Sequence, residues 1–240
     1  MMKTIYSLIL WPLAGLSFLI FISVYLILLL FIPGPKLHPI VKMGSRLMLL
    51  CGGQWLTIKG KAPPKTGQPY LYLFNHESMF DHFMLAGAVN HYISAVGKAS
   101  QFSWPIWGYL VKRYGAIPLQ RSNLSNAIQS LNLAEEAIKK GVSFIISPEG
   151  TRTLSGKMNP LKKGPFHVAK NTGVTIIPTG ILGAFDAKRK FDWRLHPGLL
   201  TVHFGKPIYF DEYINMSIEE LSEMVQNKIK QLLINKEHKL

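Results

Sequence analysis

The sequence is poor in cysteine and in acidic residues. Only Cys51 is a cysteine among 240 residues, which excludes a disulfide or a cysteine metal cluster within the chain. Its 13 acidic residues stand against 27 lysines and arginines, which gives a net charge of +14. This excess indicates an anionic partner, such as nucleic acid, a membrane surface or a phosphorylated substrate. The hydrophobic content of 48% argues against a disordered, nucleic-acid-binding arm, so we expect no nucleic-acid partner.

Charge is absent from residues 4–33, where most positions carry large apolar side chains. About thirty such residues exceed the ~20 needed to cross the hydrocarbon of a bilayer. A cleaved signal peptide is disfavoured, because its apolar region has ~7–15 residues and no small-x-small cleavage site follows here. We expect Pro12 to break the segment and to leave a membrane-spanning or deeply embedded helix over residues 13–32. Basic residues follow from Lys36 onwards, so the positive-inside bias places the rest of the chain at the cytoplasmic face, of the inner membrane in a bacterium.

Residues 38–56 have a different pattern, typical of an amphipathic helix. Apolar side chains recur at near-helical spacing, and two basic side chains stand four residues apart on another face. One interpretation places this helix on an anionic leaflet, where each basic residue contributes about 1 kcal/mol. The alternative is a helix that packs on the globular domain, and the two are compatible. The apolar positions are Ile40, Met43, Leu47 and Leu50, and the basic positions are Lys42 and Arg46.

The remainder of the chain alternates between predicted strands and helices. A proline-rich linker at 63–69 precedes them. This alternation predicts an α/β fold with a mostly parallel sheet flanked by helices. We therefore divide the chain into an N-terminal membrane anchor with the amphipathic helix at 1–58 and a catalytic α/β domain at 59–240. The predicted strands are 70–74, 92–96, 116–119, 143–147, 175–182 and 199–204, the predicted helices are 79–89, 124–138, 166–171 and 217–234, and 102–114 is helical or irregular.

Polar clusters follow three of the predicted strands. They occupy residues 75–81, 120–122 and 148–152. In a parallel sheet the carboxyl ends of the strands meet at one edge, where ligands bind. The topology therefore predicts that these three clusters form one site, although they are far apart in the sequence.

The first cluster contains a histidine and an aspartate five residues apart. On a regular helix these side chains point away from each other. They meet only if His76 lies in the turn before the helix and Asp81 lies in its first turn. Asp81 then accepts the Nδ1 proton, and Nε2 of His76 can act as a base near neutral pH. Because the sequence has no G-x-S-x-G nucleophile motif, this base would activate a hydroxyl of the substrate, although a single His-x4-Asp spacing also occurs by chance.

The cluster at 148–152 is suited to binding an anion. Arg152 offers a planar fork of donors for a phosphate, and Gly150 allows the backbone to approach a ligand closely. Glu149 can hold that arginine or accept a bond from a ligand hydroxyl. The same residues also fit a tight turn with a local ion pair. Arg121, after another strand, adds a second cation, although a single arginine is often only a solvated surface residue.

Four segments together resemble the motifs of the glycerophospholipid acyltransferase family, and most closely the 1-acylglycerol-3-phosphate acyltransferases. The resemblance covers roughly residues 70–185, and its first and third motifs are the most specific. A lysine before the second motif, Lys98, and the Lys162–Phe166 segment also resemble the family. The four motifs are Asn75-His-Glu-Ser-Met-Phe-Asp81, Gly115-Ala-Ile-Pro-Leu-Gln-Arg121, Pro148-Glu-Gly-Thr-Arg152 and Val174-Thr-Ile-Ile-Pro178.

The resemblance implies transfer of a fatty acyl chain from acyl-CoA or acyl carrier protein to the 2-hydroxyl of lysophosphatidate, which makes phosphatidate in a membrane. It implies that His76 is the base and Asp81 its orienting partner, with no metal and no cofactor beyond the acyl donor. Asn75 and Ser78 would shape the turn. The substrate-binding positions that the resemblance implies are Lys98, Arg121, Glu149, Gly150, Thr151 and Arg152.

The sequence departs from the family beside the acceptor motifs. Ser147 stands where Phe is common, and Thr153 stands where Ser is common. Pro118-Leu-Gln120 stands where an aromatic or aliphatic pair with an acidic residue is frequent. The acceptor is therefore open between lysophosphatidate, glycerol 3-phosphate and another lysophospholipid. A hydrolase of acyl thioesters and a non-catalytic lipid-binding protein are two further hypotheses. The basic loop 184–197 is either a solvated loop or a contact for lipid headgroups or for the nucleotide of coenzyme A.

Overall fold

The computed structural model describes residues 2–64, 67–120 and 124–234. Within them, seven strands form one sheet in the order β1-β7-β6-β2-β5-β3-β4. Neighbouring strands run parallel except for β6 and β7, which are antiparallel. The prediction of a mostly parallel sheet flanked by helices is confirmed. The strands are β1 (Gln54–Lys59), β2 (Tyr70–Phe74), β3 (Ile93–Lys98), β4 (Ile117–Leu119), β5 (Ser143–Ile146), β6 (Thr175–Leu182) and β7 (Gly198–Phe204).

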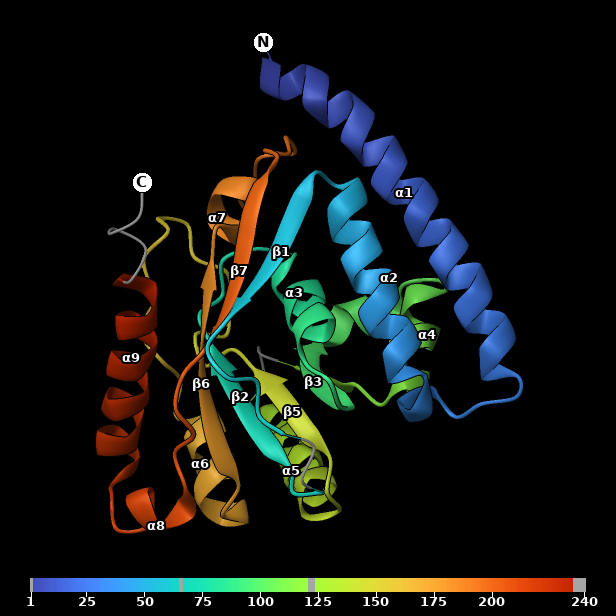
Figure 1. Cartoon of the computed structure of the whole chain (residues 1–240). Coiled ribbons are helices and arrows are strands. Elements are labelled where there is room, and N and C mark those ends of the chain that lie inside the picture. The colour runs from blue at the N-terminus through green and yellow to red at the C-terminus, as the bar shows by residue number, and fades with distance from the viewer. Residues whose placement is uncertain (1, 65–66, 121–123, 235–240) are drawn as a thin grey trace.

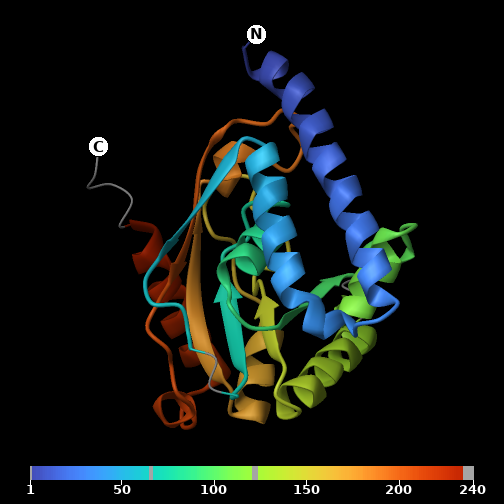
Figure 2. The same ribbon diagram turned by 45° about the vertical axis from the view of Figure 1, so that its right-hand side comes forward.

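Helices cover both faces of this sheet (Figures 1 and 2). On one face α3 (Asp81–Ala88) packs against the sheet, and α2 (His38–Cys51) packs on α3. On the other face lie α5 (Leu124–Lys139), α6 (Gly164–Thr172) and α9 (Ile218–Ile234). Strand β2 is central, and all five of its side chains are buried because both faces are covered. Burial on two sides explains why this strand reads as a continuous apolar run.

The N-terminal helix α1 (Met2–Leu29) is continuous through Pro12. The expected break at Pro12 is therefore wrong, as is the expected helix end at residue 32. The helix tolerates the lost backbone hydrogen bond because Leu10 and Trp11, beside the proline, pack against the core of the sheet. Residues 3–29 are long and apolar enough to cross a membrane by length and composition.

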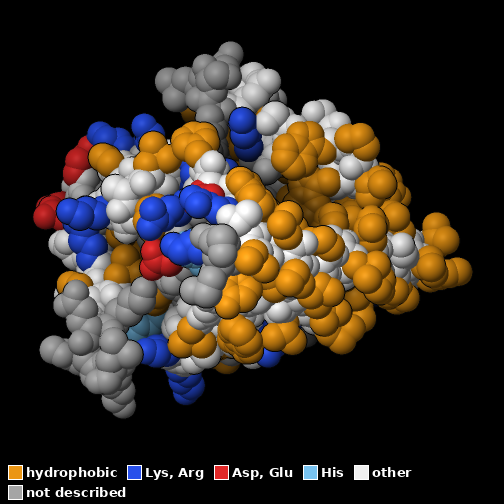
Figure 3. Space-filling view, turned by 90° about the horizontal axis from the view of Figure 1, so that it is seen from above, with side chains coloured by type: hydrophobic (Ala, Val, Ile, Leu, Met, Phe, Trp, Pro, Cys, Tyr) orange, Lys and Arg blue, Asp and Glu red, His pale blue; other side chains and the backbone are white. Residues whose placement is uncertain are grey.

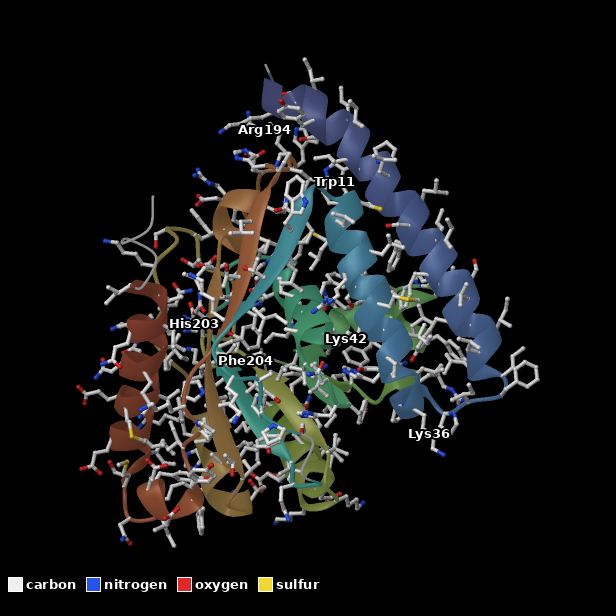
Figure 4. All side chains as sticks on the ribbon, in the orientation of Figure 1. Trp11, Lys36, Lys42, Arg194, His203 and Phe204 are labelled. Carbon is white, nitrogen blue, oxygen red and sulfur yellow. The ribbon has the colours of Figure 1, made fainter. Side chains whose placement is uncertain are left out.

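Helix α2 packs on the domain through a buried face that includes Ser45 and Leu49, and two basic side chains add hydrogen bonds. The Arg46 Nε donates to the Gly87 carbonyl at 2.7 Å, and the Lys42 Nζ donates to Asn90. Arg46 thus contacts α3, and Lys42, labelled in Figure 4, contacts the turn after it. The apolar Met43 is 63% exposed. The helix ends at Cys51, so the expected extension to residue 56 is wrong, because Gly53 takes a positive φ of 76° and the chain enters β1.

Several short elements were not predicted. Strand β1 pairs in parallel with β7 at the sheet edge. The others are η1 (Gly34–Leu37), α7 (Ala184–Ala187) and α8 (Phe210–Tyr213), while the uncertain stretch 102–114 resolves into the end of η2 (Ala99–Ser103) and α4 (Trp107–Tyr114).

Candidate active site

Two of the three predicted clusters meet at one edge of the sheet. Strand β2 lies between β5 and β6, with Leu73 beside Ile146 and Phe74 beside Thr179. The turn 75–80 and the turn 147–153 leave the sheet next to each other. In the remaining cluster, at 120–122, Arg121 lies outside the described residues.

The predicted contact between the histidine and the aspartate is confirmed. His76 lies in the turn, Asp81 is the first residue of α3, and the His76 Nδ1 is 2.7 Å from the Asp81 Oδ2. The same carboxylate accepts the backbone N–H groups of Glu77 at 2.8 Å and of Ser78 at 3.1 Å. His76 is 8% exposed and Asp81 is fully buried. The turn therefore has one fixed conformation, and the carboxylate holds the ring orientation.

Burial sets the protonation of this pair. Complete burial raises the pKa of the Asp81 carboxyl to about 7, against the lowering effects of the Ser78 N–H and of the Arg152 charge. The buried carboxyl therefore keeps its proton to a higher pH than an exposed aspartate does. When the pair has lost one proton, Nδ1 donates to the carboxylate and the lone pair of the ring is on Nε2.

Hydrogen bonds of Asn75 and Glu77 join the turn to β6 and to α7 (Ala184–Ala187), which follows β6. The Asn75 side chain accepts the N–H of Ile181 at 2.7 Å and donates to its carbonyl at 2.9 Å. The Glu77 carboxylate accepts from Asn75 at 3.2 Å and from the Phe185 N–H at 2.9 Å. The Ser78 hydroxyl donates to the Lys188 carbonyl at 2.8 Å. The expected role of Asn75 and Ser78 in shaping the turn agrees with these bonds, and Glu77 is an addition.

Glu149 joins the two motifs. Its Oε1 accepts the His76 N–H at 2.7 Å, and its Oε2 accepts the Asn159 N–H at 2.7 Å. The His76 carbonyl in turn accepts the Thr153 N–H at 2.8 Å. Burial raises the pKa of Glu149, while the N–H groups of Asn159 and His76 oppose that rise. These bonds indicate that the carboxylate positions the catalytic turn, and its predicted contact with substrate remains a prediction.

Four other residues that the sequence predicts to bind substrate lie at the same edge. Gly150 has φ = +70°, which disfavours any side chain there although a Cβ would have space. Arg152 is half-buried and close enough to Asp81 to influence its pKa. Thr151 is exposed and accepts a hydrogen bond from Lys190, and Lys98 is exposed at the end of β3. Their roles in binding remain predictions.

Sequence reasoning missed one cation. Lys188 is only 7% exposed, and its Nζ donates to the Arg189 carbonyl at 2.8 Å. Burial lowers the pKa of this amine, and the nearby Arg152 lowers it further. The basic stretch 188–190 was visible in the sequence, but nothing in the pattern separated a buried lysine from its exposed neighbours. Within the described residues, no group of three or more His, Cys, Asp or Glu side chains is arranged to hold a metal ion.

The geometry places a buried His-Asp pair beside a loop that carries cations, in an α/β fold. The family model described as "Acyltransferase" matches residues 56–182. The chain belongs to this acyltransferase family.

Individual relatives agree with that assignment. A coconut (Cocos nucifera) protein named 1-acyl-sn-glycerol-3-phosphate acyltransferase is 30% identical over 208 residues, covering 83% of this chain and 66% of the relative. The protein of that name from Limnanthes douglasii is also 30% identical, covering 84% of this chain and 73% of the relative. The crystal structure of the 1-acyl-sn-glycerophosphate acyltransferase PlsC from Thermotoga maritima superposes with a TM-score of 0.87 at 21% identity, covering 99% of each chain. This last likeness establishes the shared fold.

Proposed function

We propose that this protein is a membrane-bound acyltransferase that acylates the 2-hydroxyl of 1-acylglycerol 3-phosphate, with acyl-CoA or acyl carrier protein as the donor, to make phosphatidate. One observation carries the proposal. The His76 Nδ1 lies 2.7 Å from the Asp81 carboxylate, and the backbone of His76 is bound by Glu149 of the third motif and by Thr153, the residue after that motif. The names of the coconut and Limnanthes relatives support the acceptor.

The pair supports a direct transfer without an enzyme nucleophile. The Nε2 of His76 takes the proton of the acceptor hydroxyl while the hydroxyl oxygen attacks the thioester carbonyl. The tetrahedral intermediate then expels the thiolate, which takes the proton back from Nε2, so that an ester and a free thiol are formed. Asp81 stabilises the imidazolium that exists between these steps. A positioned base of this kind contributes about 10²–10⁴ in rate.

The acceptor phosphate requires cations beside this base. Arg152 follows Glu149 by three residues and lies close enough to Asp81 to affect its pKa. Its guanidinium is suited to a phosphate, because its donors form a planar fork. We place the acceptor phosphate on Arg152, with Arg121 and Lys98 as the further predicted contacts. Binding there would direct the 2-hydroxyl towards His76.

The N-terminal helix supports attachment to a membrane. Figure 3 shows hydrophobic side chains covering the side of the molecule on which α1 lies, and α1 exposes Leu8, Leu16 and Leu19 by 58–64%. Near its start, Trp11 donates to the Trp193 carbonyl at 2.8 Å, and near its end Leu29 is buried in a cluster with Leu110 of α4. Because α1 contacts the same domain near both of its ends, we expect it to lie embedded beside that domain in one leaflet and not to cross the bilayer. We place the domain on the cytoplasmic side.

The test is a change of His76 to Ala in a membrane assay with labelled acyl thioester. We expect transfer to fall by at least about 10²-fold, because the base is lost. His167→Ala is the matched control, since His167 is exposed on α6. Persistent transfer by the His76 variant would refute the proposal. A panel of lysophosphatidate, glycerol 3-phosphate and other lysophospholipids identifies the acceptor, and thioester turnover that survives Arg152→Ala without an acceptor would indicate a hydrolase.

A further inference from the structure

A hollow of about 440 Å³ lies beside the catalytic turn. One wall is formed by Thr153 and Leu154, which follow Arg152, and the other by residues from 185 to 194, which include α7 and the loop after it. The volume is within the range of ~300–1,000 Å³ that is usual for small-ligand sites. None of the residues in this loop belongs to the motifs that carry the catalytic base.

The loop wall is positively charged. Arg189, Lys190 and Arg194 line the hollow, and Asp192 is the acidic residue among them. Asp192 is bound on both oxygens by the Arg194 guanidinium at 2.8 Å. In the part of the chain that the structure describes, Lys190 has no carboxylate within ion-pair distance. The net charge of the wall therefore favours an anion.

Aromatic rings stand beside these cations. Phe191 is 84% exposed, and the Lys190 ammonium is 5.5 Å from its ring centre. The Arg189 guanidinium lies 5.0 Å from the centre of the Phe185 ring. The exposed Phe191 ring and the exposed Arg189 guanidinium give a flat nucleobase a surface on which to stack, while the cations bind phosphates. A hollow with both features fits an aromatic ring that carries phosphate groups.

Both walls are bonded to the turn that holds the base. The Thr153 N–H donates to the His76 carbonyl at 2.8 Å, and the Phe185 N–H donates to the Glu77 carboxylate at 2.9 Å. The Lys188 carbonyl, one residue before Arg189, accepts the Ser78 hydroxyl at 2.8 Å. A ligand in the hollow therefore lies beside the turn that carries His76, and His76 itself is not part of the lining. Figure 4 shows Arg194 near Trp11, at the end of the molecule where α1 begins, so this hollow also lies beside the membrane helix.

We propose that this hollow binds the nucleotide end of coenzyme A, the phosphorylated adenosine of an acyl-CoA donor. This inference rests on the proposed function and chooses between its two donors. A glycerophosphate acceptor has no aromatic ring that could stack on Phe185 or Phe191. The acidic surface of a carrier protein has no nucleobase that could enter the hollow. The pantetheine arm separates the nucleotide from the thioester, so the nucleotide can lie in the hollow while the thioester reaches His76.

The test is the double variant Arg189→Ala/Lys190→Ala, assayed with acyl-CoA and with acyl-phosphopantetheine, which lacks the nucleotide. We expect the KM for acyl-CoA to rise about 10- to 100-fold, because one or two charge-assisted phosphate contacts are lost. The KM for acyl-phosphopantetheine and for lysophosphatidate should change less than about twofold, since neither uses the hollow. The control is Lys139→Ala/Lys140→Ala, which removes two exposed charges before β5, at the opposite edge of the sheet from the site.

A binding measurement separates this inference from the proposed function. Titration calorimetry of coenzyme A into the His76→Ala protein needs no turnover. Adding Arg189→Ala/Lys190→Ala to that protein should raise the Kd for coenzyme A by the same factor as the KM. Phe191→Ala is a second variant, with a smaller loss of coenzyme A binding.

Unchanged KM and binding in the double variant would overturn the inference, as would use of acyl carrier protein with no binding of coenzyme A. Loss of adsorption to vesicles containing anionic lipid at constant KM would also overturn it, in favour of a headgroup contact. If coenzyme A binding is lost as expected but His76→Ala keeps its activity, the hollow stands and the proposed function fails.

Discussion

The catalytic turn 75–81 and the loop 184–194 lie side by side but are built differently. In the turn, buried carboxylates of Glu77 and Asp81 accept backbone N–H groups and fix the chain. In the loop, Asp186, Arg189 and Arg194 are exposed, and two of the charged pairs join near neighbours, Arg194 with Asp192 and Arg189 with Asp186. A base must be held to within ~0.5 Å of its working position, whereas attraction between cations and phosphates acts over many ångströms and tolerates variation. A strict sequence motif therefore marks the turn, where positions are fixed, and only a loose basic composition marks the loop, where charge is enough.

The largest effect is expected in the turn, from Asp81→Asn. The amide cannot stabilise the imidazolium and favours the wrong tautomer, so we expect kcat to fall about 10²–10⁴-fold with little change in the KM for the donor. The measurement is steady-state acyl transfer in membranes. Asp211→Asn, an exposed aspartate on α8, is the control. A variant as active as wild type would show that the pair does not act as one unit.

The same variant gives a signature in pH. Because burial raises the pKa of Asp81 to about 7, the folded wild type holds a proton that the unfolded chain releases near its ordinary pKa of ~3.9. This contribution to stability is fully present below pH ~4 and is lost as the pH rises through about 7. Wild-type activity should rise over this upper range as Asp81 loses its proton. Asp81→Asn should therefore gain stability relative to wild type between pH 5 and 8 in urea unfolding, and equal pH profiles would contradict the raised pKa.

An intermediate effect is expected at the junction of the two motifs, from Glu149→Gln. The amide keeps one acceptor oxygen, so either the His76 or the Asn159 N–H loses its partner, at a cost of about 1–3 kcal/mol. We expect a lower Tm and a kcat reduced about tenfold, with the KM for lysophosphatidate unchanged. Glu223→Gln, at an exposed position on α9, is the control. A raised acceptor KM at constant Tm would instead assign Glu149 to the substrate.

The smallest effect is expected in the loop, from Arg194→Ala. Without the guanidinium, the pKa of Asp192 returns from its lowered value towards the ordinary one, and its charge faces the hollow without a partner. We expect the KM for acyl-CoA to rise about two- to fivefold at low salt and the difference to fade at high salt, with Tm unchanged. Lys230→Ala on α9 is the control. A change in kcat instead of KM would mean that the loop orients the turn.

Much of the fold could be predicted because burial imposes a simple pattern. The run Tyr70–Phe74 reads as a strand covered on both sides, and the structure shows it so. The His76–Asp81 contact could also be predicted, because only a turn followed by a helix start brings these residues together. The predicted helix break at Pro12 was wrong, because the packing of Leu10 and Trp11 overrides the local helix-breaking tendency of proline. Local signals carry no information about such long-range packing.

The partners of the buried polar groups were beyond sequence reasoning. Glu149 was assigned to a ligand or an arginine, but its carboxylate accepts two backbone N–H groups from residues 76 and 159. Lys188 was one cation among three neighbours, and only the folded chain shows that it is buried beneath the loop. Such contacts join segments that are distant in the sequence, so no spacing rule reveals them.

The pairing of β1 with β7 has a practical consequence for anyone who wants a truncated, water-soluble version of this enzyme. Strand β1 follows directly after the amphipathic helix, and Leu56 to Lys59 lie in register with residues 200–203. Cutting at residue 59 would remove this strand and leave the backbone of β7 as an open edge, inviting aggregation. A deletion that stops before residue 38 keeps the edge strand with the helix that leads into it, and then only the surface that α1 covered needs redesign.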